Sequence, residues 1–152
     1  MNIRALIAGI GAVAVVGSGG LVLTGAVASA QSGPHPPKPS TLRFVAVTTK
    51  TIGYTKAYMA QASSDYNTSG KLIGFDVLHF TENPSGRMVT VGGSFALEDG
   101  AIYTTFTTST RSLKAAGEVI GGTGAYVHAT GTIIVATQSS TKTTVTITVP
   151  EK

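Results

Sequence analysis

The stretch GGTGAYVHATG, residues 121–131, contains glycine at positions 121, 122, 124 and 131. A phosphate-binding glycine loop follows a strand and opens a helix. Here the residues after Gly124 alternate as they do in a strand, and no Lys-Ser or Lys-Thr pair follows them. We therefore interpret the glycines as a bend or bulge at a corner between two strands.

The sequence on both sides of this corner is typical of β-structure, because it is rich in Thr, Val, Ile, Tyr and Phe. The clearest pattern is KTTVTITVP at 142–150, where valine and isoleucine alternate with threonine. Residues 55–64 fit either a strand or a short helical turn. Seven or eight strands with tight turns predict an all-β antiparallel sandwich or barrel with almost no helix. The remaining predicted strands are 41–49, 71–81, 87–97, 101–109, 112–120 and 125–137.

The N-terminal region differs in composition from the rest of the 152-residue chain, which is long enough for one domain. MNIR precedes an apolar run from Ala5 to Val27 that ends in AVASA, as in a secretory signal peptide. We expect secretion with cleavage after Ala30, so that exported protein would begin at Gln31. A membrane anchor is the alternative, because the run is long enough to span a bilayer. The predicted organisation is a signal peptide at 1–30, a proline-rich linker at 31–40 and the β-domain at 41–150.

Charge and composition exclude several function classes. The chain has no cysteine and a net charge of +4, so neither disulfides nor thiolate metal sites form. Its basic residues are scattered rather than arranged in a stripe with aromatic residues, which argues against nucleic-acid binding. The three histidines lack nearby carboxylates at metal-ligand spacing. We therefore expect no metal and no cofactor.

The glycine motif and two further segments resemble the allene oxide cyclase and dirigent barrel superfamily. EVIGGTGAYVHATG (118–131) is similar to the superfamily signature G-G-[ST]-G-x-[FY]-x-x-A-x-G between two late strands. DYNTSGKLIG (65–74) and GSFALEDGAIYTTF (93–106) resemble two earlier turns of these proteins, and the likeness spans residues 41–149. It implies an eight-stranded antiparallel β-barrel with an apolar cavity, assembled as a homo-dimer or homo-trimer.

The reaction of the plant proteins is not carried over residue by residue. Dirigent proteins have an acid where this chain has Ala125 and an arginine where it has Thr130. Plant allene oxide cyclases place a glutamate on the first strand, whereas residues 41–49 contain no acid. Function depends on the site rather than on the fold, so three hypotheses remain open. They are a cofactor-free cyclase or isomerase for an apolar unsaturated molecule, a carrier barrel for a small hydrophobic ligand, and a structural protein with a filled interior.

The candidate site residues are polar or aromatic groups on the predicted strands. His79 is the first catalytic candidate, because it shares a strand face with Phe75 and Val77. Asp76 lies on the opposite face of that strand. The other catalytic candidates are Tyr103, which follows the Asp-Gly turn, and Tyr126, which follows the glycine motif. The predicted ligand-binding residues are Phe44, Phe75, Val77 and Phe95.

Overall fold

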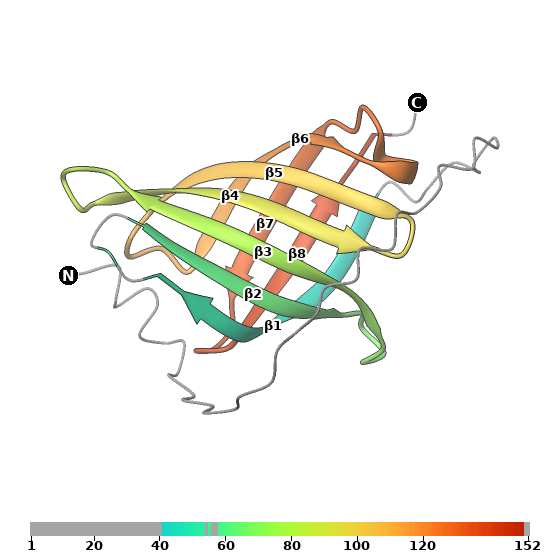
Figure 1. Ribbon diagram of the computed structural model, residues 1–152, viewed down its shortest axis with the longest axis horizontal. Coiled ribbons are helices and arrows are strands. Elements are labelled where there is room, and N and C mark those ends of the chain that lie inside the picture. Colours follow the sequence, from blue (N-terminus) through green and yellow to red (C-terminus); the bar gives the residue numbers. More distant parts are fainter. Residues whose placement is uncertain (1–40, 54, 56–57, 151–152) are drawn as a thin grey trace.

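The computed structural model describes residues 41–53, 55 and 58–150 of the chain. The described part is a closed barrel of eight strands, each antiparallel to the next (Figure 1). The predicted signal peptide, its cleavage site and the proline-rich linker lie outside the described residues. The strands are β1 (Thr41–Ile52), β2 (Tyr58–Tyr66), β3 (Leu72–Glu82), β4 (Met88–Leu97), β5 (Gly100–Ser109), β6 (Lys114–Gly122), β7 (Gly131–Thr137) and β8 (Lys142–Thr148).

Pairing of the first strand with the last closes the barrel. Thr41 lies opposite Thr148, and the register continues to Val47 opposite Lys142. Closure leaves neither β1 nor β8 as a free edge of the sheet, which removes a route to aggregation. The prediction of an all-β, eight-stranded antiparallel barrel is therefore confirmed. The single helical element among the described residues is one 3₁₀ turn, η1 (Gly124–Tyr126).

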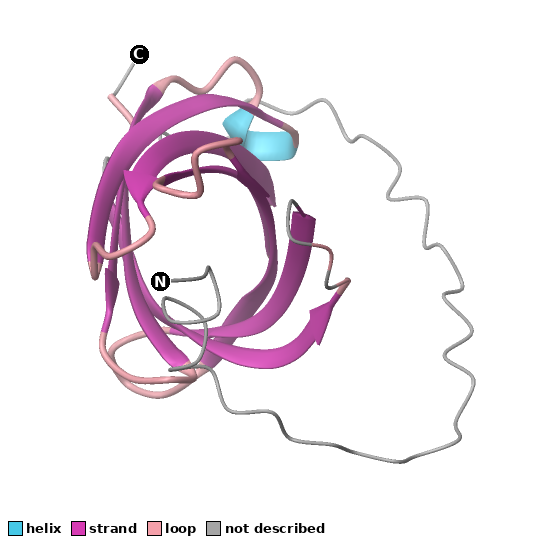
Figure 2. Ribbon diagram, turned by 90° about the vertical axis from the view of Figure 1, so that its left-hand side faces the viewer, coloured by secondary structure: helices cyan, strands magenta, loops and turns pink. Residues whose placement is uncertain are grey.

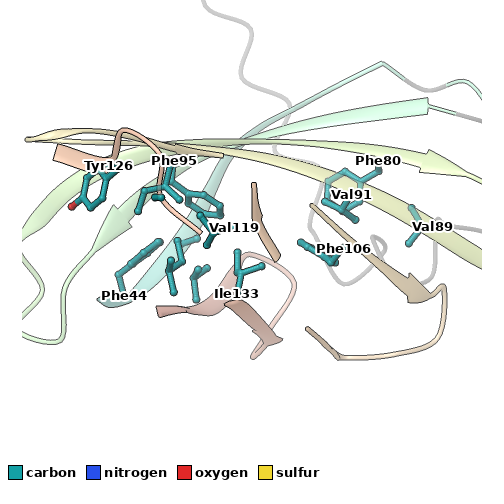
Figure 3. Packing of buried hydrophobic residues seen from close by; sticks show 14 of the residues in the cluster. Phe44, Phe80, Val89, Val91, Phe95, Phe106, Val119, Tyr126 and Ile133 are labelled. Carbon is teal, nitrogen blue, oxygen red and sulfur yellow. The ribbon is translucent and has the colours of Figure 1, made fainter. Parts of the chain in front are cut away.

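Alternate residues of each strand point into the barrel. On β4 these inward residues are Val89, Val91, Gly93 and Phe95, all of them buried. The buried apolar side chains are spread along the barrel interior (Figure 3). Phe44 and Phe95 lie near Tyr126 and Ile133 in one part, where the rings of Phe44 and Phe95 meet edge to face with centroids 5.7 Å apart.

The η1 turn lies at the rim of the barrel, at the end where β6 finishes and β5 begins (Figure 2). It is tied to the β4–β5 turn, because the Ala125 amide donates to the Asp99 carbonyl at 2.9 Å. The Tyr126 side chain is 6% exposed. This end of the barrel is therefore closed by packed side chains, and we call it the closed end. The opposite end carries the β3–β4, β5–β6 and β7–β8 turns, and we call it the open end.

The glycine motif forms the predicted corner, although the strand after it begins later than expected. We predicted a strand over 125–137, but β7 starts at Gly131. Gly124 has φ of 60° and His128 has φ of 59°, so the backbone between them is not extended. The amides of Tyr126 and Ala129 bond locally, to the carbonyls of Thr123 and Tyr126. The prediction that residues 125–130 belong to the strand was therefore wrong.

We predict that alanine in place of either of two glycines of the corner destabilises the barrel. Gly124 has positive φ, and a Cβ there would overlap the Asp99 carbonyl oxygen. A Cβ on Gly122 would lie 2.5 Å from the Ala101 carbonyl oxygen. We expect Gly122→Ala and Gly124→Ala each to lower the free energy of unfolding by roughly 1–3 kcal/mol in denaturant titrations. Gly92→Ala is the control, since a Cβ there meets nothing within 4 Å. Equal stability of all three variants would contradict this account.

Candidate functional site

The barrel interior contains a cavity of about 70 Å³ on the side of the open end. Apolar side chains form much of its wall, and Ser112, Leu113 and Lys114 from the start of β6 and the loop before it lie at its mouth. The apolar lining residues are Ala46, Leu78, Phe80, Val91, Phe106, Ala115, Val135 and Val145. The remaining lining residues are Thr48, Gln61, Ser63, Asp76, Thr108, Thr137 and Thr143.

Two aspartates face the interior from neighbouring strands. Asp76 on β3 lies opposite Ser63 on β2, while Asp65 on β2 lies opposite Gly74 on β3. The two carboxyl groups are therefore diagonal neighbours on the inner face of the sheet, within reach of one another. Asp65 is 0% exposed and Asp76 is 1% exposed. Asp76 lines the cavity and Asp65 lies behind it.

Among the described residues, no partner meets the strict hydrogen-bond geometry for either carboxyl group, although the two groups and Ser63 are close enough to interact with one another. Burial disfavours the charged form of an acid, and a second acid close by does so too. Burial, followed by the charge of Asp76, raises the pKa of Asp65 to about 8. Burial also raises the pKa of Asp76, while the side chains of Asp65 and Ser63 oppose that increase. Asp65 is therefore mostly protonated at neutral pH.

Further polar groups lie around the pair. The Gln61 amide donates a hydrogen bond to the Thr48 hydroxyl across β1 and β2. The Thr104 hydroxyl on β5 is buried, and no partner for it lies in the described part of the chain. The interior thus combines apolar walls with a few polar groups, which is the usual chemistry of a small-molecule site.

The three catalytic candidates lie elsewhere in the structure. His79 is exposed on the outer face of β3. Its Nδ1 atom lies 2.6 Å from the Tyr58 hydroxyl oxygen. Tyr103 is 39% exposed on the outside of β5. Tyr126 is buried at the closed end, and burial raises the pKa of its hydroxyl. None of the three lines the cavity.

The four predicted ligand-binding residues divide into two pairs. Phe44 and Phe95 are buried in the core of the closed end. Phe75 and Val77 lie on the outer face of β3, with exposed fractions of 56% and 39%. None of these residues lines the cavity either. The residues of β3 were assigned correctly to two opposite faces, but the face that carries Phe75 and Val77 points outward.

The alternation of residues along the sequence of β2 indicates where Asp65 points, although Asp65 was not among the predicted site residues. Gln61, Ser63 and Asp65 alternate along β2, so they share one strand face with period two. Residues 55–64 fitted either a strand or a short helical turn, so this alternation was not extended to Asp65, and the face that carries it points into the barrel interior. Because Asp76 also points inward and pairs with Ser63 on the neighbouring strand, the same alternation places the two acids close together.

Neither a metal-binding cluster nor a membrane-spanning helix is found in the part of the chain that the structure describes. No group of three or more histidine, aspartate or glutamate side chains is placed to hold a metal ion there. Among the same residues, no helix is long and apolar enough to cross a membrane.

Comparisons with known proteins identify similar folds. No family model matches this sequence, and no curated protein matches it. Pyocyanin demethylase is similar in structure, with a TM-score of 0.58 and 18% identity over 72% of this chain and 99% of that chain. AbnU, an exo-specific intermolecular Diels-Alderase, has a TM-score of 0.57 and 12% identity over 73% of this chain and 98% of its own. At these identities the likeness shows the shared barrel fold.

The buried acid predicts an unusual dependence of stability on pH. Well below pH 3.8, Asp65 is protonated in both the folded and the unfolded chain. As the pH rises from about 4 to about 8, the unfolded chain ionises at its ordinary pKa of 3.8 while the folded chain stays protonated, so the free energy of unfolding falls. Asp65→Asn removes this loss, and we expect it to stabilise the protein by roughly 2–5 kcal/mol at pH 8 and little at pH 4.

Thermal and denaturant unfolding followed by circular dichroism between pH 4 and pH 9 would measure this difference. Glu98→Gln is the control, because Glu98 is an exposed carboxylate. Stability curves for wild type and Asp65→Asn that run parallel across this pH range would contradict the assignment.

Proposed function

We propose that this protein is an allene oxide cyclase-like, cofactor-free isomerase or cyclase that acts on a small, largely apolar, unsaturated molecule. The observation that carries this proposal is the pair of buried carboxyl groups, Asp65 and Asp76, of which Asp76 lines the cavity. His79, Tyr103 and Tyr126, the earlier catalytic candidates, are replaced in this role by the two aspartates.

The carboxyl pair is costly for stability. A buried polar group without a hydrogen-bond partner costs about 1–3 kcal/mol, and a charged group costs more. An interior that served only to hold the fold would be more stable with apolar side chains at both positions. Titratable groups with strongly displaced pKa values that face a cavity are candidates for acid–base chemistry. The position of Asp76 on the cavity wall supports this role.

The two carboxyl groups have different roles in the proposed proton transfer. Asp76 lines the cavity, so its carboxyl group contacts the ligand and exchanges a proton with it. An isomerisation needs no external oxidant or reductant, because the proton taken from one position of the ligand returns at another. Asp65, protonated at neutral pH, stabilises the negative charge on Asp76 before that exchange. The apolar wall restricts the ligand to conformations close to the reacting one and keeps water away.

The size of the cavity limits how a ligand binds. Sites for drug-sized molecules usually measure about 300–1,000 Å³, whereas this cavity measures about 70 Å³. A larger ligand must therefore displace side chains at the mouth. Leu113 is 64% exposed there, and Lys114 beside it is exposed as well, so both can move without disturbing the core.

The structural comparisons support chemistry on small molecules in a barrel of this kind. One similar protein is a pyocyanin demethylase and the other is a Diels-Alderase. In each case nearly the whole of the similar protein is covered by this barrel. The alternative is a carrier that holds a hydrophobic ligand without converting it, and turnover distinguishes the two.

We predict that Asp65→Asn and Asp76→Asn lower turnover by about 10²–10⁴-fold, the usual contribution of a positioned acid or base. Binding of the same ligand should change little, because the amide has nearly the shape of the carboxyl group. The measurement combines calorimetric binding with product analysis for a panel of polyunsaturated and polyketide-like molecules. Thr104→Val is the control, since this buried hydroxyl does not line the cavity.

Two results would count against the proposed chemistry. Turnover that survives in both aspartate variants would show that other groups act. Binding without turnover of any candidate molecule by wild type would favour the carrier.

We also propose that the protein forms a homo-dimer or homo-trimer through the outer face of β2 to β5. Phe75, Val77 and Tyr103 are large side chains exposed on this face. Val77 pairs with Ser94, and Ser94 pairs with Tyr103 on the next strand. Phe75, Val77 and Tyr103 therefore lie in one patch. An exposed apolar patch of this kind is typical of an interaction surface.

We expect Val77→Asp to shift the chain toward monomer in light scattering at micromolar concentration. A charge buried without a partner in an interface destabilises the assembly. Ile134→Asp is the matched control, because Ile134 is also 39% exposed but lies on β7. A monomeric wild type, or equal dissociation of both variants, would refute this interface.

A further inference from the structure

A second hollow lies at the open end, outside the barrel interior. It is an open depression of about 480 Å³ between the β3–β4 turn and the β5–β6 loop. None of its lining residues lines the interior cavity. The residues around it are Ser85, Gly86, Arg87, Ser109, Thr110 and Arg111.

Thr110 fixes the two sides of this hollow relative to one another. Its side chain is 4% exposed. Its amide donates to the Arg87 carbonyl at 3.0 Å. Its hydroxyl lies 3.4 Å from the Gly86 carbonyl oxygen and 3.3 Å from that of Arg87. The backbone positions of Arg87 and Arg111 are therefore held on opposite sides of one hollow.

The β3–β4 turn is itself ordered by Asn83. The Asn83 side-chain oxygen accepts from the amides of Arg87 and Met88, each at 3.2 Å. These bonds use main-chain atoms of Arg87 and leave its guanidinium group free to meet a ligand. The backbone that carries Arg87 is therefore ordered before any ligand binds, which lowers the entropic cost of binding.

The groups that face the hollow are mostly hydrogen-bond donors. No ion pair of Arg87 or Arg111 occurs within the described residues. Ser109 Oγ accepts from the Arg111 amide at 3.3 Å, so the proton of its hydroxyl group is available to a ligand. Glu82 lies beside Gly86 and offsets part of the positive charge. Lys50, Lys114 and Lys142 lie at or near strand ends on the same side of the barrel and add to that charge.

We propose that Arg87 and Arg111 form an oxyanion-binding site at the open end, which takes a phosphate or carboxylate group. A guanidinium group presents a planar fork of donors that matches the oxygens of both anions. Two such groups held by one hollow repel one another, and a bound anion relieves that repulsion. The site stands apart from the proposed interior chemistry, since it needs neither Asp65 nor Asp76.

The test measures binding of simple anions to the full-length chain at low ionic strength. Inorganic phosphate and acetate are titrated separately, with calorimetry and amide chemical shifts of residues 85–87 and 109–111 as readouts. We expect saturable binding of at least one anion. Arg87→Gln combined with Arg111→Gln should weaken that binding by about tenfold or more, because charge-assisted hydrogen bonds are lost.

The matched control is Arg43→Gln combined with Lys71→Gln. It removes the same charge at the closed end of the barrel, where β1 and β3 begin. The control should bind the anion as wild type does. The anion that binds more tightly shows whether the site prefers a phosphate or a carboxylate group. Linear, non-saturating shifts, or equal weakening in the control, would overturn the proposal.

Discussion

The pairing of β1 with β8 is the constraint on which the rest of the structure depends. In an open sheet of these strands both faces would meet solvent or other elements. Closure turns one face of every strand inward at once, from Phe44 on β1 to Val145 on β8, which lie opposite one another in the register. The core, the cavity and the buried carboxyl pair all follow from that step, because each is made from inward positions of several strands.

The fold was largely readable from the sequence, and the reasons are local. Threonine alternating with valine and isoleucine over 142–148 marks β8, and the Asp-Gly turn at 99–100 marks the hairpin of β4 and β5. The start of β7 was misplaced because η1 depends on positive φ at Gly124 and His128. Histidine gives little indication of such a backbone, so the short turn was read as continuous strand.

The site was much less readable, because both faces of β3 carry apolar side chains, so polarity alone did not show which face points inward. On β3 the outward residues include Phe75 and Val77, while Asp76 points inward. A reader who assigns the apolar face to the interior chooses the wrong side of this strand. Alternation identifies the two faces of a strand but does not say which one faces the barrel interior. That choice is made jointly by all eight strands, and only the assembled structure shows it.

Packed side chains separate the cavity from the closed end. Phe44, Phe95 and Tyr126 fill the barrel beneath η1, whereas Leu113 and Lys114 line the cavity from the loop before β6 and the start of that strand. On the function that we propose, the ligand and its product use the same path past this loop. Release of the product then limits how soon the next ligand can bind, so the loop before β6 would influence the rate of turnover as well as access to the cavity.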